Sequence, residues 1–241
     1  MKVGVIGKGV WGTKIITKLA ELNHQVELIE RHENFYKKIK DVKVIFIITD
    51  DATHFKFLNK LKNTNKKIYC EKPLTHKKNE LNKIIKFKLK NIFVSDISNY
   101  YPYFKIKNKN YICRNKIDKK SYKKSKKRYD LLYRFFYHDL GYLFKRFKKI
   151  NFNNLKIICS KKYLEFEFVI NKKYFHFKYN TNKKKEYTFN QKSFYQKKDN
   201  LKIMINDFLK GSYNSKSSLN KSIQISKILE KIRLKILKSK K

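Results

Sequence analysis

Residues 2–12 of the chain read KVGVIGKGVWG, a short apolar run followed by a turn with glycine at positions 7, 9 and 12. The chain has only six glycines in 241 residues, and four of them lie in its first twelve positions. A Gly-x-Gly-x-x-Gly turn between a strand and a helix is typical of dinucleotide binding, because bare backbone can approach a pyrophosphate and the helix N-terminus offers N–H groups to it. The sequence therefore predicts that a dinucleotide binds at Gly7, Gly9, Val10, Trp11 and Gly12. The alternative is an ordinary glycine-rich turn.

The segments that follow this turn alternate between short apolar strands and amphipathic helices. Strands are expected at 25–29, 43–48, 67–70 and 92–95, and helices at about 53–63 and 76–89. This alternation is typical of a parallel, doubly wound sheet with helices on both faces. We therefore expect an α/β protein whose first domain, residues 1–97, is a Rossmann domain.

The pattern changes after residue 97. A strand near 109–113 and a helix over about 129–147 precede residues 155–190, where polar and apolar residues alternate. Alternation with period two is typical of antiparallel strands with one face open to solvent or to a partner. We therefore expect a second, smaller α+β domain over 98–241 with an antiparallel or mixed sheet. Its two final helices, near 199–210 and 218–238, are candidates to pack back on the first domain.

The formal net charge of +42 invites a nucleic-acid interpretation. Only six of the 61 basic residues are arginine, however, and a surface that binds phosphates usually includes arginine because its planar fork holds them bidentately. A chain rich in lysine, asparagine and isoleucine is also what an A+T-rich genome produces. We interpret the lysines, including the basic run at 119–128, as a solvated surface and expect no specific nucleic-acid partner.

Cellular location is constrained by two negative observations. No apolar run reaches the roughly 18–20 residues that span a bilayer, and the N-terminus shows no signal-peptide pattern, so we expect no membrane association. The three cysteines at 70, 113 and 159 are far apart and odd in number, which favours neither a disulfide framework nor a metal cluster. The sequence therefore predicts a cytoplasmic protein without a metal centre.

An acidic residue ends the second expected strand. Glu30 lies 18 residues past Gly12, close to the usual offset of about 20 for the carboxylate that binds the adenosine ribose. Such a carboxylate disfavours a 2′-phosphate, whereas the adjacent Arg31 would favour one. NAD is therefore the first choice of cofactor and NADP the second. The alternative for Glu30 is a surface acid at a strand end.

Residues 70–74 read CEKPL, and they carry the most specific pattern in the chain. A strand that ends in Glu-Lys-Pro, about 60 residues after a glycine turn, resembles the Gfo/Idh/MocA family of NAD(P)-dependent oxidoreductases. Other segments resemble family motifs in the matching order: 9–12, 49–54, 100–102, 114–115, 137–140 and 206–211. The resemblance covers most of the chain except 150–198, and the part after residue 100 is shorter than in usual members.

The resemblance implies hydride transfer between a nicotinamide and a hydroxyl or keto carbon of a sugar or nucleotide-sugar, in a homo-oligomer joined through the C-terminal sheet. It implies cofactor contacts from Thr49, His54 and Glu71, and it places Lys72 at both the cofactor and the reacting oxygen. Pro73 would fix the turn after Lys72, with a cis peptide bond as one option. On composition alone, Lys72 would be one of many surface lysines.

His138 is the candidate proton shuttle, because imidazole changes charge near neutral pH. The alternative is a histidine satisfied by packing. Many family members have an aspartate four residues earlier, where this chain has Arg134. The change indicates a different acid–base arrangement with Asp130 or Asp139, an anionic substrate, or lost activity. The expected substrate-binding residues are Tyr100, Arg114, Arg134 and Asp139.

Two other functions compete with an active oxidoreductase. One is a catalytically impaired relative that serves as a nucleotide-binding or scaffolding module, which Arg134 and the short second domain motivate. The other is a nucleic-acid binder, which the net charge alone motivates.

Overall fold

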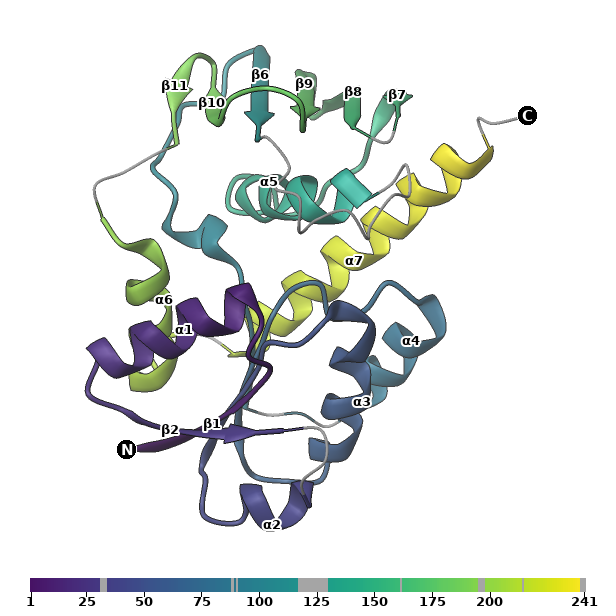
Figure 1. The fold of residues 1–241 in the computed structure, drawn as a ribbon. Coiled ribbons are helices and arrows are strands. Elements are labelled where there is room, and N and C mark those ends of the chain that lie inside the picture. Colours follow the sequence, from purple (N-terminus) through teal and green to yellow (C-terminus); the bar gives the residue numbers. More distant parts are fainter. Residues whose placement is uncertain are drawn as a thin grey trace. The chain divides into compact units, whose positions relative to one another are not determined.

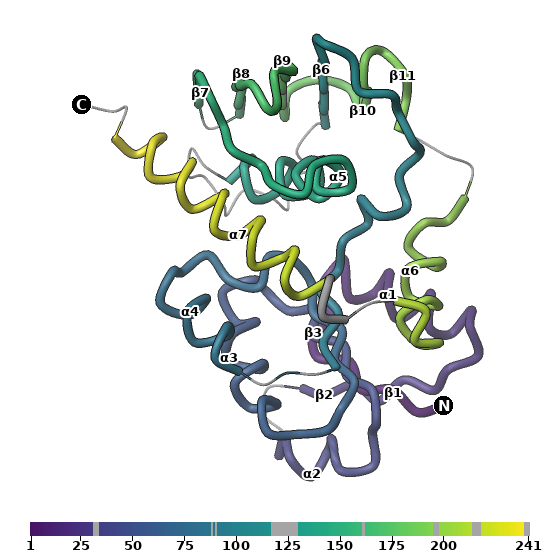
Figure 2. Tube along the Cα trace, turned by 180° about the vertical axis from the view of Figure 1, so that it is seen from behind, coloured from purple at the N-terminus to yellow at the C-terminus, as the bar shows by residue number. Residues whose placement is uncertain are grey.

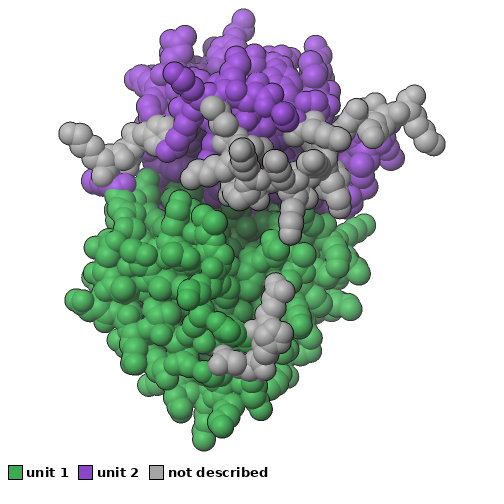
Figure 3. All heavy atoms as spheres, in the orientation of Figure 1, with its two compact units in different colours: residues 1–97, 199–227 green, residues 98–198, 228–241 purple. Residues whose placement is uncertain are grey.

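The computed structural model describes residues 1–30, 34–87, 89, 91–116, 130–160, 162–194, 198–213 and 215–238. The chain divides into two compact units, which Figure 3 shows in different colours. Unit 1 contains Met1–Ile97 and Asp199–Lys227, and unit 2 contains Ser98–Lys198 and Ile228–Lys241. One boundary falls in a 3₁₀ turn, η1 (Ile97–Tyr100), and another falls in the last helix, α7 (Ser215–Lys238). Within the described ranges, every helix is too short or too polar to span a membrane.

Unit 1 is built on a five-stranded parallel sheet, sheet A, with the strand order β2-β1-β3-β4-β5. Its strands are β1 (Lys2–Ile6), β2 (Gln25–Ile29), β3 (Val44–Ile47), β4 (Lys67–Cys70) and β5 (Ile92–Val94). β3 is buried along its whole length, as expected for a central strand covered on both faces. The chain winds outward in opposite directions from β1 and β3, so the carboxyl ends of these two strands form the switch point at which open α/β sheets bind ligands.

Helices cover both faces of sheet A (Figures 1 and 2). The helices α1 (Val10–Glu21) and α6 (Asn200–Lys210) lie on one face, whereas α3 (Asp51–Leu61) and α4 (Lys78–Lys86) lie on the other. A short helix, α2 (Phe35–Ile39), connects β2 to β3. The predicted α/β class with a doubly wound parallel sheet is confirmed.

An aromatic cluster joins α6 to sheet A. The rings of Phe46, Tyr69 and Phe93 come from three neighbouring strands, with centroid distances of 4.8 and 5.4 Å between adjacent rings. Phe208 of α6 is fully buried, and its ring lies 5.3, 5.4 and 5.6 Å from these three rings. Aromatic pairs at such distances stabilise a core beyond the effect of their buried area. The helix α6 is therefore part of the core of unit 1, and the whole segment Asp199–Lys227 belongs to this unit.

Unit 2 is built on a six-stranded mixed sheet, sheet B, with the order β11-β10-β6-β9-β8-β7. The central pair β6 and β9 is parallel, and the other neighbours are antiparallel. The strands are β6 (Lys109–Asn115), β7 (Asn153–Cys159), β8 (Tyr163–Ile170), β9 (Lys173–Asn180), β10 (Glu186–Phe189) and β11 (Lys192–Ser193). Every second residue of β8 is buried, which confirms the alternation read from the sequence.

A helical segment covers one face of sheet B. A π-helical turn, η3 (Leu132–Phe136), runs directly into α5 (Tyr137–Leu143). Its Phe136 ring packs on Phe166 and Phe177 of the sheet, with centroid distances of 4.3 and 5.1 Å. The regular helix expected over about 129–147 is thus interrupted by a π-helical turn, and α5 ends at Leu143. A sequence period of 3.6 does not reveal the wider i→i+5 turn of a π-helix.

Replacement of Phe208 by alanine should remove the ring that joins α6 to sheet A. We expect the free energy of unfolding to fall by about 3–5 kcal/mol, because truncation of a buried phenylalanine leaves a cavity. Chemical denaturation followed by circular dichroism measures this change. Ile203 is exposed on the same helix, so Ile203→Ala is the matched control and should cost less than about 0.5 kcal/mol. Equal losses in both variants would contradict the packing described above.

Candidate functional site

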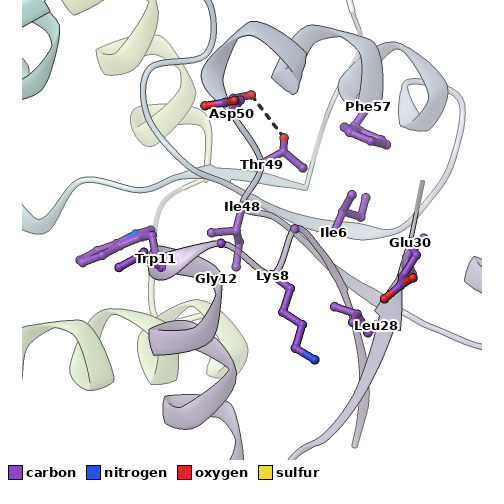
Figure 4. Close-up of a pocket in the computed structure, with 14 residues that line it drawn as sticks. Ile6, Lys8, Trp11, Gly12, Leu28, Glu30, Ile48, Thr49, Asp50 and Phe57 are labelled. Carbon is purple, nitrogen blue, oxygen red and sulfur yellow. Dashed lines mark hydrogen bonds between the residues drawn. The ribbon is translucent and has the colours of Figure 1, made fainter. Parts of the chain in front are cut away.

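A cavity of about 580 Å³ opens at the carboxyl ends of β1 and β3 (Figure 4). The strand register aligns Ile6 of β1 with Ile29 of β2 and with Ile47 of β3, so the segments that follow these strands meet at one edge of sheet A. The wall consists of residues 6–12, 28–30, 48–50 and Phe57. The cavity therefore occupies the switch point of the sheet, where a ligand is expected.

The three glycines of the turn have different surroundings. Gly7 has a φ of +106°, and a Cβ at this position would lie 2.5 Å from the carbonyl oxygen of Ile48. A Cβ at Gly12 would lie 2.2 Å from the carbonyl oxygen of Gly7. A Cβ at Gly9 would meet no heavy atom within 4 Å. Gly7 and Gly12 therefore allow close backbone packing, whereas Gly9 leaves bare backbone facing open space.

The helix α1 begins at the cavity wall. Gly9 is its N-cap, no side chain caps it, and the first turn contains no acidic residue. The first N–H groups of a helix lack partners within the helix and carry partial positive charge, so they favour an anion. Lys8 also lines the cavity, and its side chain extends from the turn (Figure 4). This part of the wall can therefore hold a phosphate group.

The two ends of the cavity differ in chemistry. Glu30 follows β2 and lies near Leu28 and Phe57 at one end, while Trp11 lies at the other end (Figure 4). A carboxylate beside apolar side chains suits a ribose that carries a flat, apolar base. Arg31, the second residue expected to choose between NAD and NADP, lies outside the described residues, as does the basic run at 119–128.

The turn after β3 is held by threonine hydroxyls. The hydroxyl of Thr53 donates a hydrogen bond to the carbonyl oxygen of Asp50 at 2.8 Å, and its oxygen lies 2.7 Å from the hydroxyl oxygen of Thr49. Thr49 and Asp50 line the cavity, so these bonds fix part of its wall. Thr49 therefore lines the cavity, and its contact with a cofactor stays a prediction.

Lys72 is not among the residues of this wall. It follows β4, whose Cys70 pairs with Ile47 of β3, so it emerges from the same edge of sheet A as the cavity. The Lys72 side chain is half-buried, and the Lys72–Pro73 peptide bond is cis. The contact of Lys72 with a reacting oxygen stays a prediction, because the wall does not include it.

Glu71 and His54 are buried rather than exposed to the cavity. Glu71 Oε1 accepts a hydrogen bond of 3.3 Å from the hydroxyl of Tyr69. His54 Nδ1 lies 2.7 Å from the carbonyl oxygen of Pro73, and Nε2 lies 3.1 Å from that of Thr49. Both side chains thus bind other parts of unit 1, and a direct contact of either with a cofactor stays a prediction.

Four of the predicted residues lie half-buried in unit 2. Arg134 belongs to η3 and His138 to α5, with the Arg134 guanidinium carbon 5.0 Å from the ring centroid of Phe135. Tyr100 ends η1, and Asp130 lies just before η3. Proton transfer by His138 and substrate binding by Tyr100 and Arg134 stay predictions.

Arg114 of β6 and Asp139 of α5 form a buried ion pair, with 2.9 Å between Nη2 and Oδ1. Asp139 also accepts hydrogen bonds from the hydroxyls of Tyr179 and Tyr187, and the Arg114 guanidinium carbon lies 3.5 Å from the Tyr187 ring centroid. Burial and the Asp139 carboxylate raise the pKa of Tyr179 well above its ordinary value. The structure therefore gives both residues a packing role between strand and helix, and their binding of a substrate stays a prediction.

The sequence analysis missed the apolar part of the cavity wall. Leu28, Ile48 and Phe57 line the cavity, but each belongs to an apolar pattern that also describes core residues. Leu28 could have been found, because it lies two residues before the predicted ribose-binding Glu30. We find no sequence signal for Phe57, which reaches the wall from α3.

No family model and no curated protein matches the chain, but solved structures do. One is UDP-N-acetylglucosamine 3-dehydrogenase GnnA from Acidithiobacillus ferrooxidans, with a TM-score of 0.79 and 13% identity over 97% of this chain and 96% of that one. Another is the WlbA dehydrogenase from Thermus thermophilus in complex with NAD and UDP-GlcNAcA. Its TM-score is 0.78 and its sequence identity 11%, over 97% of this chain and 94% of that one. A third is the dehydrogenase MviM from Clostridium difficile. Its TM-score is 0.73 and its sequence identity 13%, over 98% of this chain and 99% of that one.

These neighbours are oxidoreductases of the Gfo/Idh/MocA type. The chain has their fold. At this level of identity the similarity concerns architecture, and it extends over nearly the whole chain. The fold expected from the sequence resemblance is therefore confirmed, whereas the shorter second domain stays a prediction.

The different surroundings of Gly9 and Gly12 predict different effects of alanine. Gly12→Ala should lower the free energy of unfolding by about 3 kcal/mol or more, because the new Cβ would overlap the backbone oxygen of Gly7 and the helix must shift. Gly9→Ala should lower it by no more than about 1 kcal/mol, because the added methyl group meets open space and only the weaker N-capping of alanine remains. Urea denaturation of the two variants measures both values, and similar losses would contradict the geometry of the turn.

Proposed function

We propose that the chain is an NAD(P)-dependent oxidoreductase that transfers a hydride between a nicotinamide and a hydroxyl or keto carbon of a sugar or nucleotide-sugar. The observation that carries the proposal is the cavity at the switch point, with bare Gly9 backbone in its wall and Glu30 at one end. The shared fold supports it, since GnnA is a dehydrogenase of UDP-N-acetylglucosamine and WlbA was solved with NAD and UDP-GlcNAcA. NAD is the preferred cofactor and NADP the alternative.

The residues of the wall fit a dinucleotide. The absent Cβ of Gly9 lets the backbone approach a pyrophosphate, and the N–H groups at the start of α1, together with Lys8, supply positive charge. Glu30 would accept hydrogen bonds from the ribose hydroxyls, while Leu28 and Phe57 would flank the base. When bound, the nicotinamide supplies the hydride chemistry, and the protein supplies orientation and proton handling.

Proton handling falls to Lys72 and His138 in this proposal. Lys72 follows a parallel strand at its carboxyl end, where its ammonium group could donate a hydrogen bond to the reacting oxygen. A lysine that is partly desolvated beside a cation releases its proton more readily, which suits acid–base work. His138 is the second candidate for acid–base work, because imidazole changes charge near neutral pH.

Self-association is a further part of the proposal. The face of sheet B opposite the helical segment carries half-buried Tyr163, Glu165 and His176. The distance between Glu165 Oε1 and His176 Nε2 is 2.5 Å. This face is our candidate for the contact between copies of the chain.

Cofactor binding can be measured through Trp11, which is the only tryptophan of the chain and lines the cavity. Reduced nicotinamide absorbs where tryptophan emits, so titration with NADH should quench the Trp11 fluorescence in a saturable way. NADPH should bind more weakly, because the Glu30 carboxylate repels a 2′-phosphate. The absence of saturable quenching with both dinucleotides would refute the proposed function.

The Lys72→Ala variant separates binding from chemistry. We expect turnover with nucleotide-sugars to fall by about 10²–10⁴-fold, the usual contribution of a general acid or base, while saturable NADH binding is retained. Production of NADH from NAD with a panel of sugars and nucleotide-sugars measures this loss. The exposed Lys78 at the start of α4 gives the matched control, since Lys78→Ala should turn over like the unmodified chain.

Arg134 favours a second candidate function. Arg134 is a basic residue four positions before His138, where the resemblance leads us to expect an aspartate. The second candidate is therefore a catalytically impaired relative that binds NADH without turnover. Reduction of NAD by one member of the panel would dismiss it.

A further inference from the structure

His54 is a buried histidine with a carbonyl oxygen opposite each ring nitrogen. Its side chain is 1% exposed, and the two N–O distances are 2.7 Å to Pro73 and 3.1 Å to Thr49. A carbonyl oxygen can only accept a hydrogen bond, so each contact requires a proton on the nitrogen that makes it. A neutral imidazole has one N–H and can satisfy one of the two carbonyl groups. The imidazolium form satisfies both.

An acidic residue lies close enough to balance this charge. Asp51 precedes His54 by one turn of α3, and Asp51 Oδ2 lies 2.8 Å from Nε2 of His76. Burial acts to raise the pKa of Asp51, but the hydrogen bond and charge of His76 and the charge of His54 outweigh it and lower the pKa below its ordinary value. Asp51 is therefore ionised at neutral pH. The charged residues of the segment that faces α3 after β4 are Glu71, Lys72, His76, Lys77 and Glu80.

The two carbonyl groups belong to the two segments that matter most for the proposed chemistry. Thr49 lines the cavity, and Pro73 directly follows Lys72. The ring of His54 thus spans the turn after β3 and the loop after β4. Its attachment to α3 gives both contacts a rigid support.

We propose that His54 is a positioning residue that carries a proton on each ring nitrogen and thereby fixes the Lys72–Pro73 segment against the cavity wall. Its role differs from the direct cofactor contact that the sequence suggests, because its ring nitrogens are occupied by backbone oxygens. The effect on cofactor binding rests on the proposed function, whereas the protonation state does not.

Ring-nitrogen NMR of the ¹⁵N-histidine-labelled chain tests the protonation state without any ligand. The chain has six histidines, and the signals lost in His54→Gln assign the ring of His54. Both His54 nitrogens should carry protons at neutral pH, as their two carbonyl acceptors require. His24 is the internal reference, because burial and the N-terminal amino group lower its pKa and it should become neutral first. A His54 ring with one unprotonated nitrogen at neutral pH would overturn the proposal.

Titration with NADH, followed through Trp11, tests the positioning role. His54→Gln should weaken NADH binding by roughly tenfold, equivalent to about 1.4 kcal/mol, because one amide group cannot span both carbonyl oxygens. His24→Gln, which alters a half-buried histidine in the turn after α1, should leave the affinity unchanged. Unaltered affinity in His54→Gln would overturn the positioning role.

Two further outcomes keep this test separate from the proposed function. If the unmodified chain binds neither dinucleotide, the proposed function fails, while the NMR result still decides the protonation state of His54. If His54→Gln does not fold, substitution of each of the other five histidines assigns the His54 ring by elimination. Because this ring lies between the Thr49 wall segment and the Lys72–Pro73 segment, saturating NADH should then shift its ring-nitrogen signals, and unshifted signals would refute the role.

Discussion

The site depends on a steric constraint, the contact of three backbone segments with no side chain between them. At Gly7 the chain passes the end of β3, and at Gly12 the helix α1 passes the end of β1. Both contacts are so close that a Cβ on either glycine would overlap a backbone oxygen. Overpacking of this kind cannot be relieved by rotating a side chain, because the backbone fixes the position of a Cβ and the atom that it would meet is a backbone carbonyl oxygen. The constraint brings the N-terminus of α1 to the switch point of sheet A, and the cavity follows from that placement.

Most of unit 1 could be predicted from the sequence, because its signals are local. The apolar run at 43–48 indicates a strand covered on both faces, and the structure buries β3 throughout. In unit 2 the decisive contacts join residues far apart in the sequence. The ion pair between Arg114 and Asp139 links a strand to a helix, and nothing in the local pattern of either segment reveals the other. The π-helical turn η3 was hidden for a related reason, because neighbouring aromatic residues satisfy a regular helical period as well.

The sequence predicts the parts of the candidate site that depend on bare backbone or on a charged side chain. It does not predict the parts that depend on packing. Gly9 and Glu30 were predicted from spacing, and both lie in the cavity wall. Phe57 was not, because a phenylalanine on α3 has the same pattern whether it faces the core or a cavity. His54 shows a third situation. The family-like segment 49–54 indicates that His54 belongs to the site, but only the two carbonyl oxygens beside its ring indicate what the side chain does.

The net charge of +42 and the chemistry of the site act over different distances. A dinucleotide and a nucleotide-sugar are both anionic, so a lysine-rich surface attracts either and raises the rate of encounter without distinguishing them. Physiological salt screens exposed charges beyond about 8 Å, so discrimination must come from groups in the wall itself. Among the lysines that the structure describes, Lys8 lies in that wall, with the start of α1 beside it and Glu30 also in the wall. The composition would therefore favour encounter with any anionic ligand, whereas under the proposed function the residues at the switch point would select among phosphate-bearing ligands.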